Sequence, residues 1–220
     1  MKNNIYLFVG VTALLLAGFI AGTRVYQRSQ ESNLTFLAHE KSELFIRDHS
    51  PRFGKKDAKV YLVEFLDPEC ESCRVFYPEI KKMLKEFDGK LQLVIRYAPF
   101  HQNSKHAIKV LEATKEQGKY HEALEFLFET QPVWADHHHP RPELVYKLLP
   151  KIGIDIEKLK KDMQSPKIKK VIDQDFSDLK ELNVRGTPTF FVNGEKPNAF
   201  GIVPLRLKIL EMIKKEYGNE

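Results

Sequence analysis

The apolar and polar positions of the chain predict two strands joined by a helix. Residues 60–66 and 91–97 are short runs rich in apolar and β-branched side chains, which is typical of buried strands. Between them, apolar residues from Phe76 to Phe87 recur at helical spacing and share one face of a helix. Two strands connected through a helix over about forty residues are expected to lie parallel, with a right-handed connection.

A long helical region follows the second strand. Glycines and prolines divide it into segments with apolar residues at helical spacing, so each segment is expected to form a helix. These segments are residues 104–117, 119–130, 142–149, 156–163 and 166–182. A further helix is predicted over residues 203–217, close to the end of the sequence.

The first segment of the chain is strongly apolar. Residues 5–22 contain no charged side chain, while Lys2 precedes them and Arg24 follows them. A stretch of this length is just long enough to cross a bilayer as a helix. We therefore expect a transmembrane signal anchor over residues 1–23, with a cleaved signal peptide as the alternative.

The remaining residues are expected to form a linker and one domain. Residues 24–56 are mostly polar and predict a juxtamembrane linker, in which an amphipathic helix would pack on the domain or pair with a second copy. With 220 residues, 42% of them hydrophobic, the chain can bury one sizeable core, which we place in residues 57–220. The formal charge of +5 comes from lysines interspersed with glutamates, which does not favour a nucleic-acid partner.

The two cysteines lie where the first predicted strand gives way to the helix. Cys70 and Cys73 are separated by Glu71 and Ser72. The first turn of a helix has unpaired N–H groups and the positive end of the macrodipole, and both favour a thiolate at Cys70. Cys73 is about one turn further along, within reach of a mixed disulfide formed on Cys70. The sequence thus predicts a centre for thiol–disulfide exchange.

Three further features accompany the cysteines. Glu64 lies on the predicted strand before Cys70, and Pro78 lies within the helix after Cys73. The third is the stretch from Arg185 to Gly194, which reads as a loop followed by a β-hairpin. Together these features resemble the thioredoxin superfamily, and the helical region over about residues 102–182 is similar to the insertion of its DsbA-like family. The resemblance implies an α/β thioredoxin fold, a central mixed β-sheet flanked by helices with a helical insertion, in addition to the N-terminal transmembrane helix.

The resemblance also implies roles for individual residues. Cys70 would exchange disulfides with a substrate and Cys73 would resolve the mixed disulfide, so that the two form a redox-active disulfide. Thr187 and Pro188, whose shared peptide bond would be cis, would position the substrate. No organic cofactor is required.

Glu64 has two interpretations. A carboxyl group buried on an apolar strand has a raised pKa, which suits it to transfer a proton to or from Cys73. Alternatively it satisfies a polar neighbour, and Arg96 at the end of the second strand is a possible partner.

The resemblance and the apolar segment together suggest the setting in which the cysteines work. Disulfides persist outside the cytosol, so the domain is expected on the periplasmic or exterior side of a membrane. Its partners would be cysteine-containing proteins and a membrane or extracytoplasmic redox partner that recycles the dithiol. The direction of electron flow stays open, although the carboxylates of Glu69 and Glu71 beside Cys70 favour a potential lower than that of DsbA.

Two other classes of function use the same residues. Cys70 and Cys73 would bind Cu(I) in a metal-handling protein, and the fold without turnover would serve as a binding adaptor. Asp136 and the run His137–His139 lie on a predicted surface connection, where we expect no metal site. His101 follows the second strand and either packs within its loop or lines the active-site face.

Overall fold

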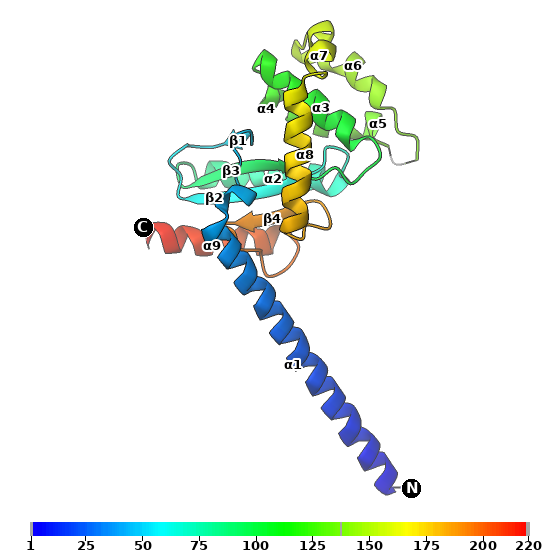
Figure 1. Ribbon diagram of the computed structural model, residues 1–220, viewed down its shortest axis with the longest axis vertical. Helices are drawn as coiled ribbons and strands as arrows, with labels where there is room; N and C mark the ends of the chain where they lie inside the picture. The colour runs from blue at the N-terminus through cyan, green and yellow to red at the C-terminus, as the bar shows by residue number, and fades with distance from the viewer. Residues whose placement is uncertain (1, 137, 219–220) are drawn as a thin grey trace.

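The computed structural model describes residues 2–136 and 138–218, with side chains in the first helix described for residues 10–29, 32 and 40. Within these residues a four-stranded mixed sheet forms the centre of the molecule (Figure 1). Its strands lie in the order β1-β3-β2-β4, and β2 and β3 are parallel while the outer pairs are antiparallel. The strands are β1 (Arg52–Phe53), β2 (Val60–Leu66), β3 (Leu91–Tyr97) and β4 (Thr189–Val192). The predicted parallel strands and the mixed sheet are confirmed.

Helices cover both faces of the sheet. The helices α2 (Glu71–Glu86) and α9 (Ile202–Tyr217) place buried apolar side chains against one face. The other face is covered by α8 (Pro166–Glu181) and by the 3-10 turn η1 (Ser42–Leu44). Alternate residues of the central strand β2 therefore enter two separate cores, which explains why its sequence is apolar almost throughout.

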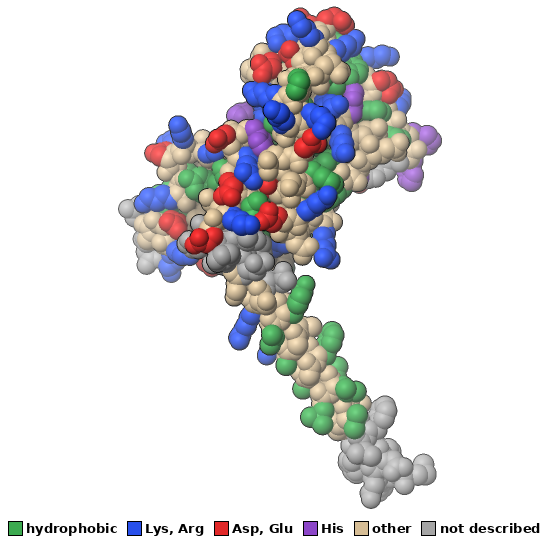
Figure 2. Space-filling model, in the orientation of Figure 1, with side chains coloured by type: hydrophobic (Ala, Val, Ile, Leu, Met, Phe, Trp, Pro, Cys, Tyr) green, Lys and Arg blue, Asp and Glu red, His purple; other side chains and the backbone are tan. Residues whose placement is uncertain are grey.

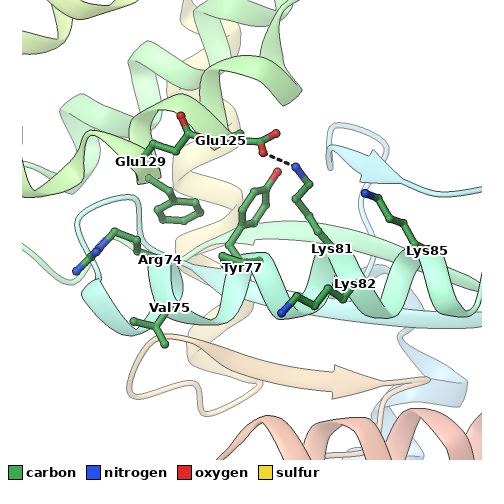
Figure 3. A pocket seen from close by; sticks show the side chains of 10 residues that line it. Arg74, Val75, Tyr77, Lys81, Lys82, Lys85, Glu125 and Glu129 are labelled. Atoms are coloured by element: carbon green, nitrogen blue, oxygen red, sulfur yellow. Dashed lines mark hydrogen bonds and ion pairs between the residues drawn. The ribbon is translucent and has the colours of Figure 1, made fainter.

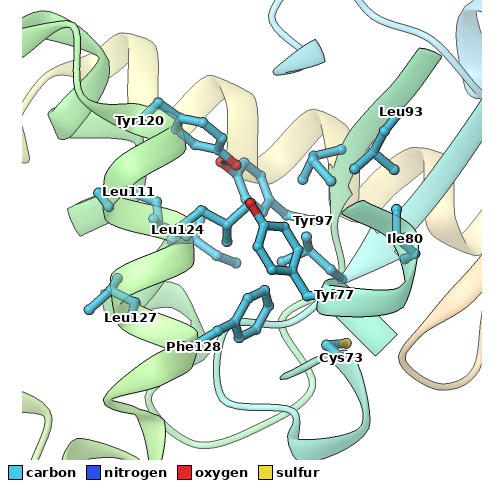
Figure 4. Packing of buried hydrophobic residues seen from close by; sticks show 14 of the residues in the cluster. Cys73, Tyr77, Ile80, Leu93, Tyr97, Leu111, Tyr120, Leu124, Leu127 and Phe128 are labelled. Atoms are coloured by element: carbon cyan, nitrogen blue, oxygen red, sulfur yellow. Dashed lines mark hydrogen bonds between the residues drawn. The ribbon is translucent and has the colours of Figure 1, made fainter. Parts of the chain in front are cut away.

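The helical insertion extends the core on the α2 side of the sheet. Its elements are α3 (Ser104–Thr114), η2 (Lys115–Gln117), α4 (Tyr120–Glu129), α5 (Gln131–Trp134), η3 (Pro142–Leu144), α6 (Val145–Leu148), η4 (Leu149–Ile152) and α7 (Ile156–Asp162). Figure 4 shows α4 side chains packed beside Tyr77 of α2 and Tyr97 of β3. The Tyr97 hydroxyl lies 2.9 Å from the Tyr120 hydroxyl and donates to Glu112 at 2.7 Å, so both buried hydroxyl groups have hydrogen-bond partners.

The hairpin expected after β4 is reduced to a turn. Asn193 and Gly194 have φ values of 47° and 85°, as in tight hairpin turns. Beyond them, only an isolated bridge between Val192 and Glu195 continues the pairing within the described residues. Pro197 then follows, and its missing backbone N–H cannot contribute to a ladder.

The packed domain begins upstream of Asp57, the position expected from the sequence. Leu44 and Phe45 are buried against the sheet, and β1 pairs with β3. The helix before them, α1 (Lys2–Glu40), is continuous and 39 residues long, so it runs through both the expected anchor and most of the expected linker. Packed residues occur upstream of Asp57 because Leu44 and Phe45 bury their apolar side chains in the second core.

Helix α1 projects away from the domain (Figure 1), and apolar side chains such as Leu14 and Phe19 are exposed along it (Figure 2). Within the part of the chain that the structure describes, no helix is both long enough and apolar enough to cross a membrane. The expected span over residues 5–22 begins with residues 5–9, whose side chains lie outside that part.

A buried ion network joins α8 to the sheet and to the segment after η1. The Arg96 guanidinium, fully buried on β3, donates to Asp175 at 2.8 Å and to Asp178 at 2.5 Å. Arg47 also donates to Asp178, at 2.7 Å, and Nε2 of His49 lies 2.7 Å from Asp175. Each buried charge thus faces an opposite one.

The suggested pairing of Arg96 with Glu64 is therefore wrong. In the strand register, Glu64 lies opposite Ile95, whereas Arg96 lies opposite Phe65. Because neighbouring residues of a strand point to opposite faces, the two side chains lie on different sides of the sheet.

Replacing Arg96 with leucine should destabilise the domain strongly. The variant leaves Asp175 and Asp178 buried without their main counter-charge, so we expect the free energy of unfolding to fall by about 3–5 kcal/mol. Urea unfolding followed by circular dichroism measures this. The control Lys169→Ala removes an exposed ion pair with Asp173 on the same helix and should change stability by less than about 1 kcal/mol. Equal effects of the two substitutions would contradict the expectation.

Candidate active site

Cys70 is the N-cap of α2, at the point where β2 ends. Its backbone is extended, with φ −74° and ψ 118°, and its sulfur accepts the backbone N–H of Cys73 at 3.4 Å. The Cys70 S–H lies 3.2 Å from the carbonyl oxygen of Thr187, which it can donate to while protonated. Asp67-Pro68 ends the strand, and this turn places the sulfur at the helix terminus as the sequence predicted.

The two cysteines differ in acidity. A hydrogen bond from the Cys73 thiol lowers the pKa of Cys70 most, and burial opposes it. A hydrogen bond with the Thr187 side chain, the Cys73 N–H and the charge of His101 lower the pKa further, to about 6. Burial raises the pKa of Cys73 well above its ordinary value. Both are free thiols, and the hydrogen bond between the sulfurs brings them together. Near neutral pH Cys70 is therefore mostly in the thiolate form, which is the form able to act as a nucleophile, and Cys73 stays protonated.

Glu64 lies fully buried on β2, on the same face of the sheet as the core packed on α2. Neither carboxyl oxygen has a hydrogen-bond partner among the described residues, so the interpretation in which it satisfies a polar neighbour fails. Burial, with a smaller contribution from the charge of Cys70, raises the pKa of Glu64 to about 8. The charge of Glu64 in turn raises the pKa of Cys73, so the three groups are electrostatically linked.

The loop before β4 completes the site. The peptide bond between Thr187 and Pro188 is cis, which confirms the conformation expected for this loop. Thr187 lines a cavity of about 350 Å³ together with Cys70, and Phe100 and Arg185 lie on its wall. The structure therefore brings together the predicted cysteines and the predicted proline loop, although they are far apart in the sequence.

An apolar surface continues from the proline loop. A second cavity of about 180 Å³ is lined by Pro188, Phe190 and Phe200. The Phe76 ring packs between those of Phe190 and Phe200, with centroids 5.2 Å and 5.1 Å away, yet Phe200 remains 67% exposed. An exposed aromatic side chain next to the proline loop offers contact area for an apolar segment of another protein.

The sequence did not indicate that Asp67 organises the loop after β3. Its Oδ2 atom accepts the backbone N–H groups of Phe100 and His101 at 2.9 Å and 3.1 Å, and the Ser104 hydroxyl at 2.6 Å. Glu69 accepts the backbone N–H of Asn103 at 2.6 Å, so its carboxylate is bound to this loop. The Asp-Pro pair predicted only a turn, because the partners are more than thirty residues away.

Gln131 of α5 is a second residue that sequence reasoning missed. Its buried Nε2 donates to the carbonyl oxygens of Pro68 and Cys70, at 2.8 Å and 3.0 Å, and its Oε1 accepts from Arg74 at 2.9 Å. The insertion therefore holds the turn that carries the reactive sulfur. A glutamine before Pro132 carries no sequence signal for this role, and the predicted helix pattern did not include α5.

Another groove, of about 450 Å³, lies between α2 and α4 (Figure 3). Tyr77 and Phe128 are among the residues that line it, and Figure 3 shows an ion pair between Lys81 of α2 and Glu125 of α4. Neither cysteine lines this groove, so it is separate from the site around Cys70.

Asp136 organises the described part of the histidine run. Oδ1 of Asp136 accepts the backbone N–H groups of His138 and His139, at 2.7 Å and 3.1 Å, as in a surface turn, while His137 lies outside the described residues. Among the described residues, no group of three or more histidine, cysteine, aspartate or glutamate side chains is arranged to hold a metal ion.

Comparisons with known proteins agree with this geometry. A family model described as thioredoxin matches residues 47–200. The probable disulfide bond formation protein D of Bacillus cereus is 29% identical over 208 residues, covering 90% of this chain and 93% of that protein. The Na(+)/H(+) antiporter NhaA of Herminiimonas arsenicoxydans is 29% identical over 143 residues, but the chain spans only 22% of its length.

Solved structures show the same fold. BdbD from Bacillus subtilis, in its oxidised form, is 28% identical with a TM-score of 0.67, and the match covers 76% of this chain and 94% of that one. The thiol–disulfide exchange protein alpha-DsbA2 from Wolbachia pipientis is 22% identical with a TM-score of 0.70, covering 84% of this chain and 98% of that one, which supports the fold alone. The chain belongs to the thioredoxin family and is a thiol–disulfide oxidoreductase.

Proposed function

We propose that the chain exchanges disulfides with cysteine-containing proteins outside the cytoplasm, through Cys70 and Cys73 of its Cys-Glu-Ser-Cys motif. The observation that carries the proposal is the Cys70 sulfur, held at the start of α2 and facing the carbonyl of Thr187 beside the cis Pro188. A hydrogen bond that stabilises the thiolate favours a sulfur that can attack a substrate disulfide and can also act as the leaving group of a mixed disulfide.

The reaction follows from the order of acidities. In the reducing direction, the Cys70 thiolate attacks a substrate disulfide, and one substrate sulfur leaves as a thiolate. Cys73 then loses its proton and attacks Cys70, which forms the Cys70–Cys73 disulfide and releases the second substrate thiolate. Oxidation of a substrate is the reverse sequence. An extended substrate would pair with the backbone of Thr187, as strands add to one another.

Glu64 supplies the proton-transfer step of this proposal. Its pKa of about 8 keeps the carboxyl group mostly protonated near neutral pH but allows it to ionise there. A group with this pKa is suited to accept the proton of Cys73, whose own pKa is raised by burial. The absence of competing hydrogen bonds among the described residues leaves both oxygens available for that exchange.

The acidity of Cys70 also bears on the direction of electron flow. Its pKa of about 6 lies between values of about 3.5 in DsbA and about 7 in thioredoxin. We therefore expect a reduction potential between roughly −120 mV and −270 mV, the values of those two proteins. A redox partner must regenerate the form that the substrate consumes.

Helix α1 is proposed to anchor this activity in the membrane. At about 1.5 Å per residue, its 39 residues extend about 58 Å, and the exposed apolar side chains lie on the part that projects from the domain. The apolar residues 5–22 would insert, with the domain on the extracytoplasmic side.

Disulfide exchange is tested directly by enzyme assays. Purified protein should accelerate insulin reduction by glutathione and oxidation of a reduced two-cysteine peptide, whereas Cys70→Ser should lose at least 100-fold, on the order expected when a nucleophile is removed. Cys73→Ser should accumulate a mixed disulfide, visible on non-reducing gels. Ser72→Ala is the control that keeps both sulfurs. Wild type without turnover would contradict the proposal and favour an adaptor, and Cu(I) binding without turnover would favour metal handling.

Glu64→Gln should change stability in a pH-dependent way. Because the folded-state pKa of about 8 lies above the ordinary 4.5, Glu64 destabilises the fold increasingly as pH rises between these values. The free energy of unfolding of the variant, measured with urea, should exceed that of wild type by about 1 kcal/mol at pH 5 and about 3 kcal/mol at pH 7. Glu79→Gln, on the surface of α2, should show no such trend. A difference that stays constant with pH would contradict the raised pKa.

Membrane anchoring is tested by fractionation of cells that express the full chain. The protein should remain with membranes after alkaline carbonate extraction. Added protease should digest the domain once the envelope layers outside the anchoring membrane have been made permeable. A variant lacking residues 1–23 is the control and should be soluble. Full-length protein released by carbonate would contradict the anchor, and protection of the domain from protease would contradict its orientation.

A further inference from the structure

His101 is held in a fixed position beside the active site by Asp67. Asp67 is fully buried, and its Oδ2 atom lies 2.8 Å from Nδ1 of His101. The same oxygen accepts the backbone N–H of His101 and of Phe100, so both the ring and the loop that carries it are fixed to the end of β2. A carboxylate at Nδ1 makes this nitrogen the N–H donor and leaves Nε2 as the site that gains the second proton.

His101 and Cys70 face the same space. Both line the cavity of about 350 Å³ that also contains Thr187, and the imidazole is 31% exposed. Cys70 is the N-cap of α2 and His101 follows β3, so the two arrive from neighbouring parallel strands. The predicted alternative in which His101 lines the active-site face is the one the structure adopts.

The charges around the imidazole favour its protonated form. Burial alone would lower the pKa of His101, but the hydrogen bond and charge of Asp67 raise it above the ordinary value, and the charge of Cys70 adds to this. Glu69 and Asp136 line a small cavity with His101, while Glu71 and Arg185 line the cavity shared with Cys70. Arg185 is the one cation in this set, so the surroundings of the ring are mainly acidic.

We propose that Asp67 and His101 form a positioning pair that holds an imidazolium beside the Cys70 sulfur and stabilises its thiolate. The inference rests on the exchange reaction proposed above. When a second substrate thiolate attacks the substrate sulfur of the mixed disulfide, the bond to Cys70 breaks and its electron pair stays on Cys70. The new disulfide then belongs to the substrate. A nearby positive charge makes Cys70 the better leaving group and stabilises the reduced form.

The test is a pH titration of thiolate absorbance at 240 nm in the reduced full-length chain. His101→Asn keeps an N–H for Asp67 but removes the positive charge, so the Cys70 midpoint should rise by about half to one pH unit. At pH 7 the equilibrium with glutathione should then shift about three- to sixfold towards the disulfide. In His101→Lys, which keeps a positive charge, the Cys70 midpoint should stay closer to that of wild type. His106→Asn on α3, outside this cavity, should leave the midpoint unchanged.

A reciprocal measurement does not depend on the folding of these variants. If the two charges stabilise each other, the titration midpoint of the His101 ring, followed by NMR, must fall in Cys70→Ser by the amount that His101→Asn adds to Cys70. An unchanged midpoint in either experiment, or equal shifts in His101→Asn and His101→Lys, would overturn the inference. None of these titrations requires substrate turnover, so a failed exchange assay with the expected midpoints would refute only the proposed function.

Discussion

A sulfur anion persists in a nearly dry site only when hydrogen-bond donors surround it, and the structure around Cys70 meets this requirement. Only 5% of the residue is exposed, so water supplies few of the donors. The thiol and backbone N–H of Cys73 supply others, and both exist because β2 ends and α2 begins at this point. The strand–helix junction is thus also the chemical centre of the molecule.

The same low-polarity environment acts in opposite directions on neighbouring groups. Cys70 has donors and becomes more acidic, whereas Cys73 and Glu64 are buried without enough of them and become less acidic. The same core therefore contains one thiol that is mostly ionised near neutral pH, Cys70, and one that stays protonated, Cys73. No additional cofactor is needed to explain this difference, since burial and hydrogen bonding account for it.

The sequence predicted those parts of the structure that depend on local patterns. The bounds of β2 and β3 and the start of α2 follow from apolar runs and from the Asp-Pro turn, and the structure has them where they were expected. The resemblance of the proline loop predicted that this loop lies beside Cys70, and the contact between Cys70 and Thr187 agrees with it. By contrast, the burial of Leu44, upstream of the expected start of the domain, was not predicted, because it depends on α8, far along the chain.

Long-range polar contacts are what the sequence could not predict. Arg96 was considered a partner for Glu64, yet the pleat of the sheet directs it to Asp175, a residue in a helix that carries as many lysines as acidic residues. Asp67 and Gln131 likewise looked ordinary, since their roles depend on loops that only the folded chain brings close. A polar residue has many possible partners along the chain, whereas an apolar run has one general requirement, which is burial.

The contacts of Gln131 have a consequence for the insertion as a whole. Because this side chain from α5 caps the carbonyl oxygens of Pro68 and Cys70, the added helices are not a detachable module on a self-sufficient thioredoxin fold. Excising them, or grafting them from another protein, would remove one hydrogen-bond donor from each of two backbone carbonyls at the reactive turn. Substitutions in the insertion are therefore constrained by the turn, because position 131 must keep a donor for the carbonyls of Pro68 and Cys70.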